Sequence, residues 1–133
     1  MTANWMSPNP FNSLDDFEEA YFEAALWSTV DADTGRPLDD CYDVDDLREA
    51  MPEWFEEQLR DIEDFRESNE ELLDQAGDDA QNGHDFWLTR ERHGTGFWDR
   101  GYGRVGDELT KAAQVYGSAG DDLSLGLPCG EER

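Results

Sequence analysis

Acidic side chains are concentrated in the first half of this chain. Residues 14–80 contain 25 acidic and 4 basic side chains, whereas residues 81–133 contain 9 and 6. The formal net charge of −24 exceeds what the solubility of a small domain requires. Five Trp, four Tyr and seven Phe nevertheless indicate a folded core, because disordered chains are poor in aromatic residues. We therefore expect one folded domain that tolerates considerable self-repulsion at its surface.

Apolar residues recur at helical spacing within the acidic half and predict a helix at its start. Ser13 is a suitable N-cap and Asp16 can complete a capping-box-like start. The apolar positions are numerous enough for burial on more than one side: Leu14, Phe17, Tyr21, Phe22, Ala24, Ala25, Leu26 and Trp27. A turn-rich connector follows at residues 31–40. A short helical turn is then expected at residues 45–50, capped by Asp45 or Asp46.

The next helix is the longest element that we expect. Pro52 suits its first turn, because proline lacks the N–H group that would have no partner there. Its apolar face consists of Met51, Phe55, Leu59, Ile62, Phe65, Leu72 and Leu73, with Asn69 interrupting it. Gly77 is a natural residue to end this helix.

The second half of the chain changes character. Residues 86–89 and 96–99 form two short aromatic runs, joined by a glycine-containing link, which is typical of a β-hairpin. Residues 107–116 predict a further helix, and residues 123–127 could add a third strand. The predicted fold class is α+β, with two or three helices packed on a small antiparallel sheet that contains the aromatic hairpin.

The predicted elements divide the chain into three parts. Residues 1–13 form an irregular lead-in, residues 14–127 a single α+β domain, and residues 128–133 a C-terminal tail. The domain comprises an acidic helical half, residues 14–80, and a hairpin-plus-helix half, residues 81–127. No signal peptide is recognisable, and no apolar stretch approaches the roughly 20 residues that span a bilayer. We therefore expect a cytoplasmic protein without a membrane partner.

The long predicted helix carries a stripe of carboxylates. Glu53, Glu57, Asp61, Asp64, Glu67, Glu71 and Asp74 recur at spacings of three or four, and Glu56, Glu63 and Glu70 flank them. Like charges four residues apart destabilise a helix by a few tenths of a kcal/mol per pair, and only Arg60 and Arg66 are placed to relieve them. We therefore predict that these ten residues bind a basic partner. DNA carries about one charge per 1.7 Å, so carboxylates of the first helix and of residues 39–46 would be needed to approach its density.

Other interpretations of the charged residues stay open. The acidic stripe can be a solvated face, as most charge runs are. Salt adaptation would spread acid over the whole surface, whereas here the excess ends near Ala80. Arg90, Arg92, Arg100 and Arg104 lie among aromatic residues, a pattern that can stack single-stranded bases. At this net charge we favour their pairing with the acidic helices of the same protein, or a small role in contact with another protein.

A small metal-dependent enzyme is a further alternative. His84 and His93, with Asp85 and Asp99 nearby, could hold a divalent metal if the hairpin brought them together. No HExxH pattern is present, and neither cysteine is adjacent to a histidine, so we assign no catalytic residue, metal or cofactor. For Cys41 and Cys129 we favour two reduced thiols, with one long-range disulfide as the alternative.

Three stretches in this order resemble a family of small bacteriophage proteins that carry an HDFWLTR…HG.GFWDR core. They are YFEAALWSTVD with the downstream PLDDCYDVDDL, then GHDFWLTRERHGTGFWDRGYG, then LTKAAQVYG. The match covers most of the chain from Phe17 to Gly117. The resemblance implies a phage or prophage origin and a bacterial cytoplasm, and it carries over no catalytic residue. The tail SLGLPCGEER departs from the family pattern, in which a strand and an acidic turn are expected.

Charge and resemblance together lead to one functional prediction. The chain is expected to be a phage-encoded, non-enzymatic inhibitor of a host defence protein that binds nucleic acid, of the anti-CRISPR or anti-restriction type. It would act by nucleic-acid mimicry and bind no nucleic acid itself, as a monomer or homodimer. The alternative is a structural or regulatory phage protein whose acidic surface residues only interact with solvent.

Overall fold

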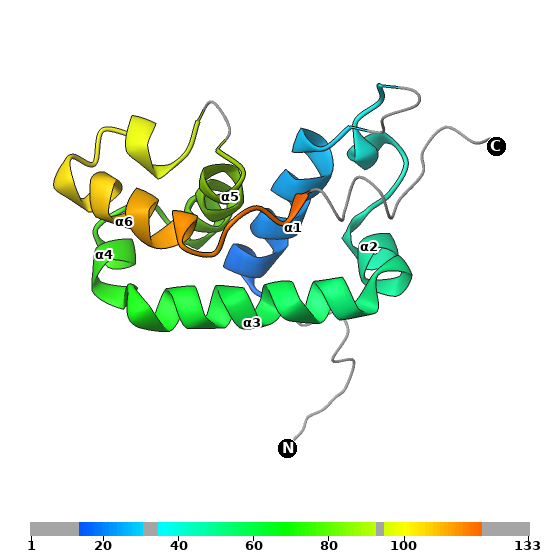
Figure 1. Cartoon of the computed structure of the whole chain (residues 1–133), viewed down its shortest axis with the longest axis horizontal. Coiled ribbons are helices and arrows are strands. Elements are labelled where there is room, and N and C mark those ends of the chain that lie inside the picture. Colours follow the sequence, from blue (N-terminus) through cyan, green and yellow to red (C-terminus); the bar gives the residue numbers. More distant parts are fainter. Residues whose placement is uncertain (1–13, 31–34, 93–94, 121–133) are drawn as a thin grey trace, which may run out of the picture.

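The computed structural model describes residues 14–30, 35–92 and 95–120. These residues form six α-helices and two short 3₁₀ turns (Figure 1). The elements are α1 (Asp16–Ser28), η2 (Leu38–Asp40), α2 (Val44–Ala50), α3 (Pro52–Ser68), α4 (Glu70–Asp74), α5 (Asp79–Arg90), η3 (Phe97–Asp99) and α6 (Arg104–Gln114). Within these ranges the only β-type pairing is an isolated bridge between Val30 and Pro37. The fold is therefore all-α, and the predicted α+β class is wrong.

The expected aromatic hairpin is the source of this error. Residues 86–89 belong to α5, and residues 97–99 form the 3₁₀ turn η3. Every residue from Asp85 to Arg90 is buried, so α5 shows no polar stripe that would reveal its helical period. A short apolar run of this kind does not distinguish a buried helix from a buried strand. The expected third strand, at residues 123–127, lies outside the described residues.

Helix α1 is buried on more than one side, as its broad apolar face predicts. Its buried residues are Phe17, Tyr21, Phe22, Ala24, Ala25 and Leu26. The N-cap is Asp15 rather than Ser13, which lies outside the described residues. Asp15 and Glu18 form a reciprocal capping box, in which each side chain accepts a hydrogen bond from the other residue's backbone N–H.

The long helix α3 begins at Pro52, as predicted, but ends at Ser68 instead of near Gly77. Asn69 interrupts it, with a non-helical backbone and a side-chain amide that donates to the carbonyl oxygen of Phe65 at 2.9 Å. Such local side-chain bonds compete with helix continuation. The remaining residues form the separate short helix α4. Helix α2 is likewise capped by Asp43, not by Asp45 or Asp46.

The core lies where α1 and α5 pack together and both contact the apolar side of α3. Figure 1 shows α3 along one edge of the molecule, with α1 and α5 on the same side of it. Phe22 stacks on Phe55 and Phe65 on Phe86, each with ring centroids 4.0 Å apart. The side of α3 that faces away from these rings is left to solvent.

Two further expectations concern membranes and cysteines. Within the described ranges, no helix is both long and apolar enough to cross a membrane. Cys41 is disulfide-bonded and not a free thiol, so the favoured interpretation of two reduced thiols is wrong; Cys129 lies outside the described residues.

Candidate functional site

The solvent side of α3 presents a face of carboxylates. Trp54, Phe55, Gln58, Ile62 and Phe65 occupy the buried side of the helix. Six acidic residues lie on the opposite side, and all are exposed: Glu53, Glu56, Glu57, Glu63, Asp64 and Glu67. At 3.6 residues per turn they fall within an arc of about 120° and span about 21 Å along the axis. We call these six residues the α3 acidic face.

The other predicted residues divide between two places. Glu70, Glu71 and Asp74 are exposed but belong to α4, beyond the break at Asn69. Figure 1 shows that α4 turns away from the axis of α3, so the stripe is not one straight rod. Asp61 lies at the edge of the buried side and forms an ion pair with Arg90 at 3.1 Å. Asp61 is therefore engaged within the protein and is only partly exposed.

Internal partners account for little of the charge on the α3 acidic face. Asp64 accepts a hydrogen bond from the hydroxyl group of Tyr116. The other five carboxylates form no ion pair with any basic residue of the described ranges. Arg60, also exposed, is the basic residue in the middle of this face. Along 21 Å a DNA duplex would carry about twelve charges, so the face has about half that density.

A groove runs beside the α3 acidic face, between α1 and α3. Its volume is about 470 Å³. Glu18 on one side and Glu56, Glu63 and Glu67 on the other line it, and Ile62 is among its apolar residues. Arg60 and Arg66 also line it and offset part of this negative charge. Burial raises the pKa of Glu18 above its ordinary value. The groove therefore adds a carboxylate from α1 to those of α3, as the comparison with DNA required.

The residues that carry the phage-family resemblance mainly hold one another in place. Asp85 is fully buried and binds Arg100, whose Nη2 and Nε lie 2.8 and 3.2 Å from its Oδ1. The Thr89 hydroxyl accepts a hydrogen bond from the backbone N–H of Phe97 at 3.2 Å. A Cβ at Gly96 would overlap that hydroxyl, so only glycine fits there. These contacts join α5 to η3. The residues of this motif can therefore be accounted for by their role in packing.

Three of the four arginines suspected of stacking bases pair within the protein. Arg90 binds Asp61, Arg100 binds Asp85, and Arg104 binds Glu108. Of these pairs, Arg90 with Asp61 is of the expected kind, with an acidic helix, whereas Arg100 and Arg104 pair within the second half of the chain.

The suggested metal ligands do not converge in the described part of the chain. His84 stacks on Trp27 with ring centroids 5.5 Å apart, and its Nδ1 lies 3.7 Å from Asp85. Asp85 is already bound by Arg100, Asp99 accepts from the backbone N–H of Gly96, and His93 lies outside the described residues. Among the described residues no group of three or more His, Cys, Asp or Glu is arranged to hold a metal ion.

Asp85 allows a prediction about pH. Burial alone would raise the pKa of its carboxyl group, but the neighbouring His84 ring, the hydrogen bonds from Arg100 and the guanidinium charge hold that pKa below its ordinary value. Asp85→Asn is expected to lower the free energy of unfolding by about 2 kcal/mol at neutral pH. Because the folded-state pKa is depressed, this contribution is complete above about pH 4 and is lost as the pH falls through the folded-state pKa.

Urea denaturation of both proteins across this pH range measures the difference. Asp107→Asn, at an exposed position of α6, is the control and should stay within about 0.5 kcal/mol of the wild type. A difference for Asp85→Asn that stays constant down to the lowest pH would contradict the role given to the carboxylate.

A second acidic region lies outside the ten predicted residues. Glu19 and Glu23 of α1, Asp39 of η2 and Asp45 of α2 line another groove. They come from three separate elements, so no regular spacing connects them in sequence. In the sequence, this region was indicated only by the many acidic residues of the first helix and of residues 39–46.

Comparison of the chain with protein-family models, with curated proteins and with solved structures found no match. The function of this protein is therefore inferred from its acidic surfaces and from the resemblance of its sequence to small bacteriophage proteins.

Proposed function

We propose that this protein binds a basic, nucleic-acid-binding protein of a bacterial host and occupies its nucleic-acid site. The α3 acidic face would take the place of phosphates, and the protein would act as a phage-encoded inhibitor without enzymatic activity. The observation that carries this proposal is that five carboxylates on one side of one helix form no ion pair with a basic residue of the described ranges. The phage resemblance favours a cytoplasmic target in the host defence.

The way α3 is held supports this use of its exposed side. Phe55 stacks on Phe22 and Phe65 on Phe86, so the helix is fixed to the core along its length. Its carboxylates are thus presented from a rigid backbone, which reduces the entropy cost of binding. Uncompensated charge of one sign also steers a basic partner and raises the association rate.

A solvating role for the acid, in a structural or regulatory phage protein, is the alternative. Arg60 in the middle of the face and the half-density relative to DNA favour it. The two functions differ in what a change of charge on α3 does to binding.

Displacement of DNA tests the proposal. Labelled duplex DNA is bound to each of a panel of bacterial defence proteins, and the present protein is added at rising concentration. We expect it to displace DNA from at least one of them, less effectively as salt is increased. Glu56→Gln with Glu63→Gln removes two charges from the α3 acidic face and should weaken displacement about fivefold, since each exposed ion pair contributes about 0.5 kcal/mol.

The matched control removes two charges from α6, by Asp107→Asn with Glu108→Gln, and should displace DNA as the wild type does. Equal potency of the two double variants would favour a solvating role for α3. A failure to displace DNA from every member of the panel would count against inhibition by mimicry.

A further inference from the structure

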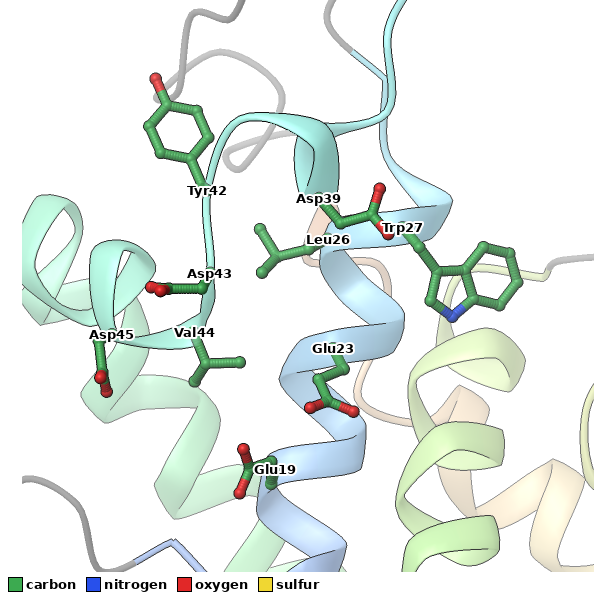
Figure 2. Close-up of a pocket in the computed structure, with 9 residues that line it drawn as sticks. All are labelled: Glu19, Glu23, Leu26, Trp27, Asp39, Tyr42, Asp43, Val44 and Asp45. Carbon is green, nitrogen blue, oxygen red and sulfur yellow. The ribbon is translucent and has the colours of Figure 1, made fainter.

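The second groove lies between α1 and the segment that runs from η2 into α2. Figure 2 shows Leu26 of α1 and Val44 of α2 directed toward one another between the two ribbons. The volume of the groove is about 470 Å³, within the range of about 300–1,000 Å³ that ligand pockets have. It is thus a hollow with an apolar part, and its lining residues are distinct from those of the α3 acidic face.

Carboxylates from three elements are among the residues that line this groove. Glu19 and Glu23 come from α1, Asp39 from η2, and Asp43 and Asp45 from the start of α2 (Figure 2). No basic residue is among the nine that line it. Asp43 is used as the N-cap of α2, but the described contacts assign no hydrogen bond or ion pair to the other four. Burial and the neighbouring charge of Glu19 raise the pKa of Glu23.

The apolar lining also restricts the kind of occupant. Val44 can contact the aliphatic stem of a long side chain whose charged end stays near the carboxylates, whereas Leu26 is only 2% exposed. Trp27, which is 39% exposed, lies at the margin of the groove and is stacked on His84. Arginine combines an aliphatic stem with a planar cation that suits carboxylates.

A bare metal ion does not fit these observations. Among the described residues the carboxylates are not grouped closely enough to hold one. The charge is spread along the hollow, so it complements several cations carried on one extended molecule.

We propose that this groove binds an arginine-rich segment of a protein partner. The inference rests on the proposed function, because the segment would belong to the same basic protein that docks on the α3 acidic face. The partner would then be held at two places, by a folded basic surface on α3 and by an extended basic segment between α1 and α2. Two linked contacts raise the overall affinity without requiring either to be strong.

A labelled oligo-arginine peptide is the probe, and its binding is measured by fluorescence anisotropy with the full chain. The groove variant carries Glu19→Gln, Glu23→Gln, Asp39→Asn and Asp45→Asn. These residues are exposed and lie away from the core, and their neutralisation reduces self-repulsion, so the fold should be retained. We expect peptide affinity to fall about tenfold. The matched control, Glu56→Gln, Glu57→Gln, Glu63→Gln and Glu67→Gln, removes the same charge from α3 and should lose clearly less.

Each outcome separates the two proposals. If the groove variant binds the peptide as the wild type does, or loses no more than the α3 control, the groove proposal is overturned while the DNA-displacement result stands on its own. If the groove variant alone loses affinity but DNA displacement fails, the groove remains a site for basic peptides and the mimicry proposal falls. Spermine that displaces the peptide at equal charge concentration would overturn the assignment to a peptide.

Discussion

Replacement of Arg90 with methionine is expected to lower the free energy of unfolding by about 3–5 kcal/mol. The Arg90 side chain is 3% exposed and reaches from α5 across the core. Its Nη1 donates to the Tyr21 hydroxyl at 2.9 Å and to Gln58 Oε1 and Asp61 Oδ2, each at 3.1 Å. Its Nε and Nη2 donate to the backbone carbonyl oxygens of residues 117 and 116. Methionine fills part of the space but removes this donor from Tyr21, Asp61 and the two carbonyl oxygens, whereas Gln58 Oε1 still accepts from the Tyr21 hydroxyl at 2.6 Å.

The cost of this substitution comes mainly from the groups that remain. Tyr21 and Gln58 are buried, and Asp61 would keep a charge at the edge of the core without its cation. Urea denaturation measures the effect, with Arg104→Met as control because the Arg104 side chain is 89% exposed. The control should remain within about 0.5 kcal/mol of the wild type. A second change, Asp61→Leu, should restore part of the stability of Arg90→Met, because it removes the unpaired charge.

A loss below about 1 kcal/mol for Arg90→Met would mean that water replaces the guanidinium group at little cost. The two carbonyl acceptors would then not depend on this arginine, and the segment after α6 would be held by its other contacts.

Gly83→Ala is expected to destabilise the protein by at least about 3 kcal/mol. Gly83 lies in α5 where α1 crosses it most closely, and a Cβ would overlap the backbone carbonyl oxygen of Phe17. A backbone atom cannot turn aside as a flexible side chain can, so the two helices would have to move apart. Helix propensity would by itself stabilise the Gly83→Ala variant, because alanine is about 1 kcal/mol more favourable than glycine within a helix.

The reverse substitution on the same helix separates these two effects. Ala80 is exposed in the first turn of α5, so Ala80→Gly should cost no more than about 1 kcal/mol through propensity alone. Thermal unfolding followed by circular dichroism compares the two variants. A gain in stability for Gly83→Ala would show that α1 and α5 are not as close as the structure places them.

Periodicity predicted those helices that have one side in solvent. Helix α3 alternates between buried Phe55, Ile62 and Phe65 and exposed acid, and this contrast revealed both its existence and its start at Pro52. Helix α5 has no such contrast, because it is enclosed by α1, α6 and η3. Its aromatic run therefore resembled a strand, and the predicted sheet was wrong for that reason.

The candidate site was predictable to the extent that it depends on exposure alone. Nine of the ten chosen carboxylates are exposed, because charged side chains on a helix avoid the core. The partners of Asp61 and Asp64 are Arg90 and Tyr116, which lie 29 and 52 residues away in sequence. Contacts at such separation, like the convergence of Glu19, Asp39 and Asp45 on one groove, depend on how the helices cross, which local spacing does not record.

The pairing of α1 with α5 also determines how the chain must assemble. These helices are joined by residues 29–78, which contain 19 acidic and 4 basic side chains, and this whole connection has to contract before Phe17 meets Gly83. A neutral loop of this length adds little entropy cost beyond that of a shorter one, but a loop of like charges resists contraction. Counterions that shield it therefore favour core formation, and the same ions later weaken the attraction of the finished surface for a basic protein.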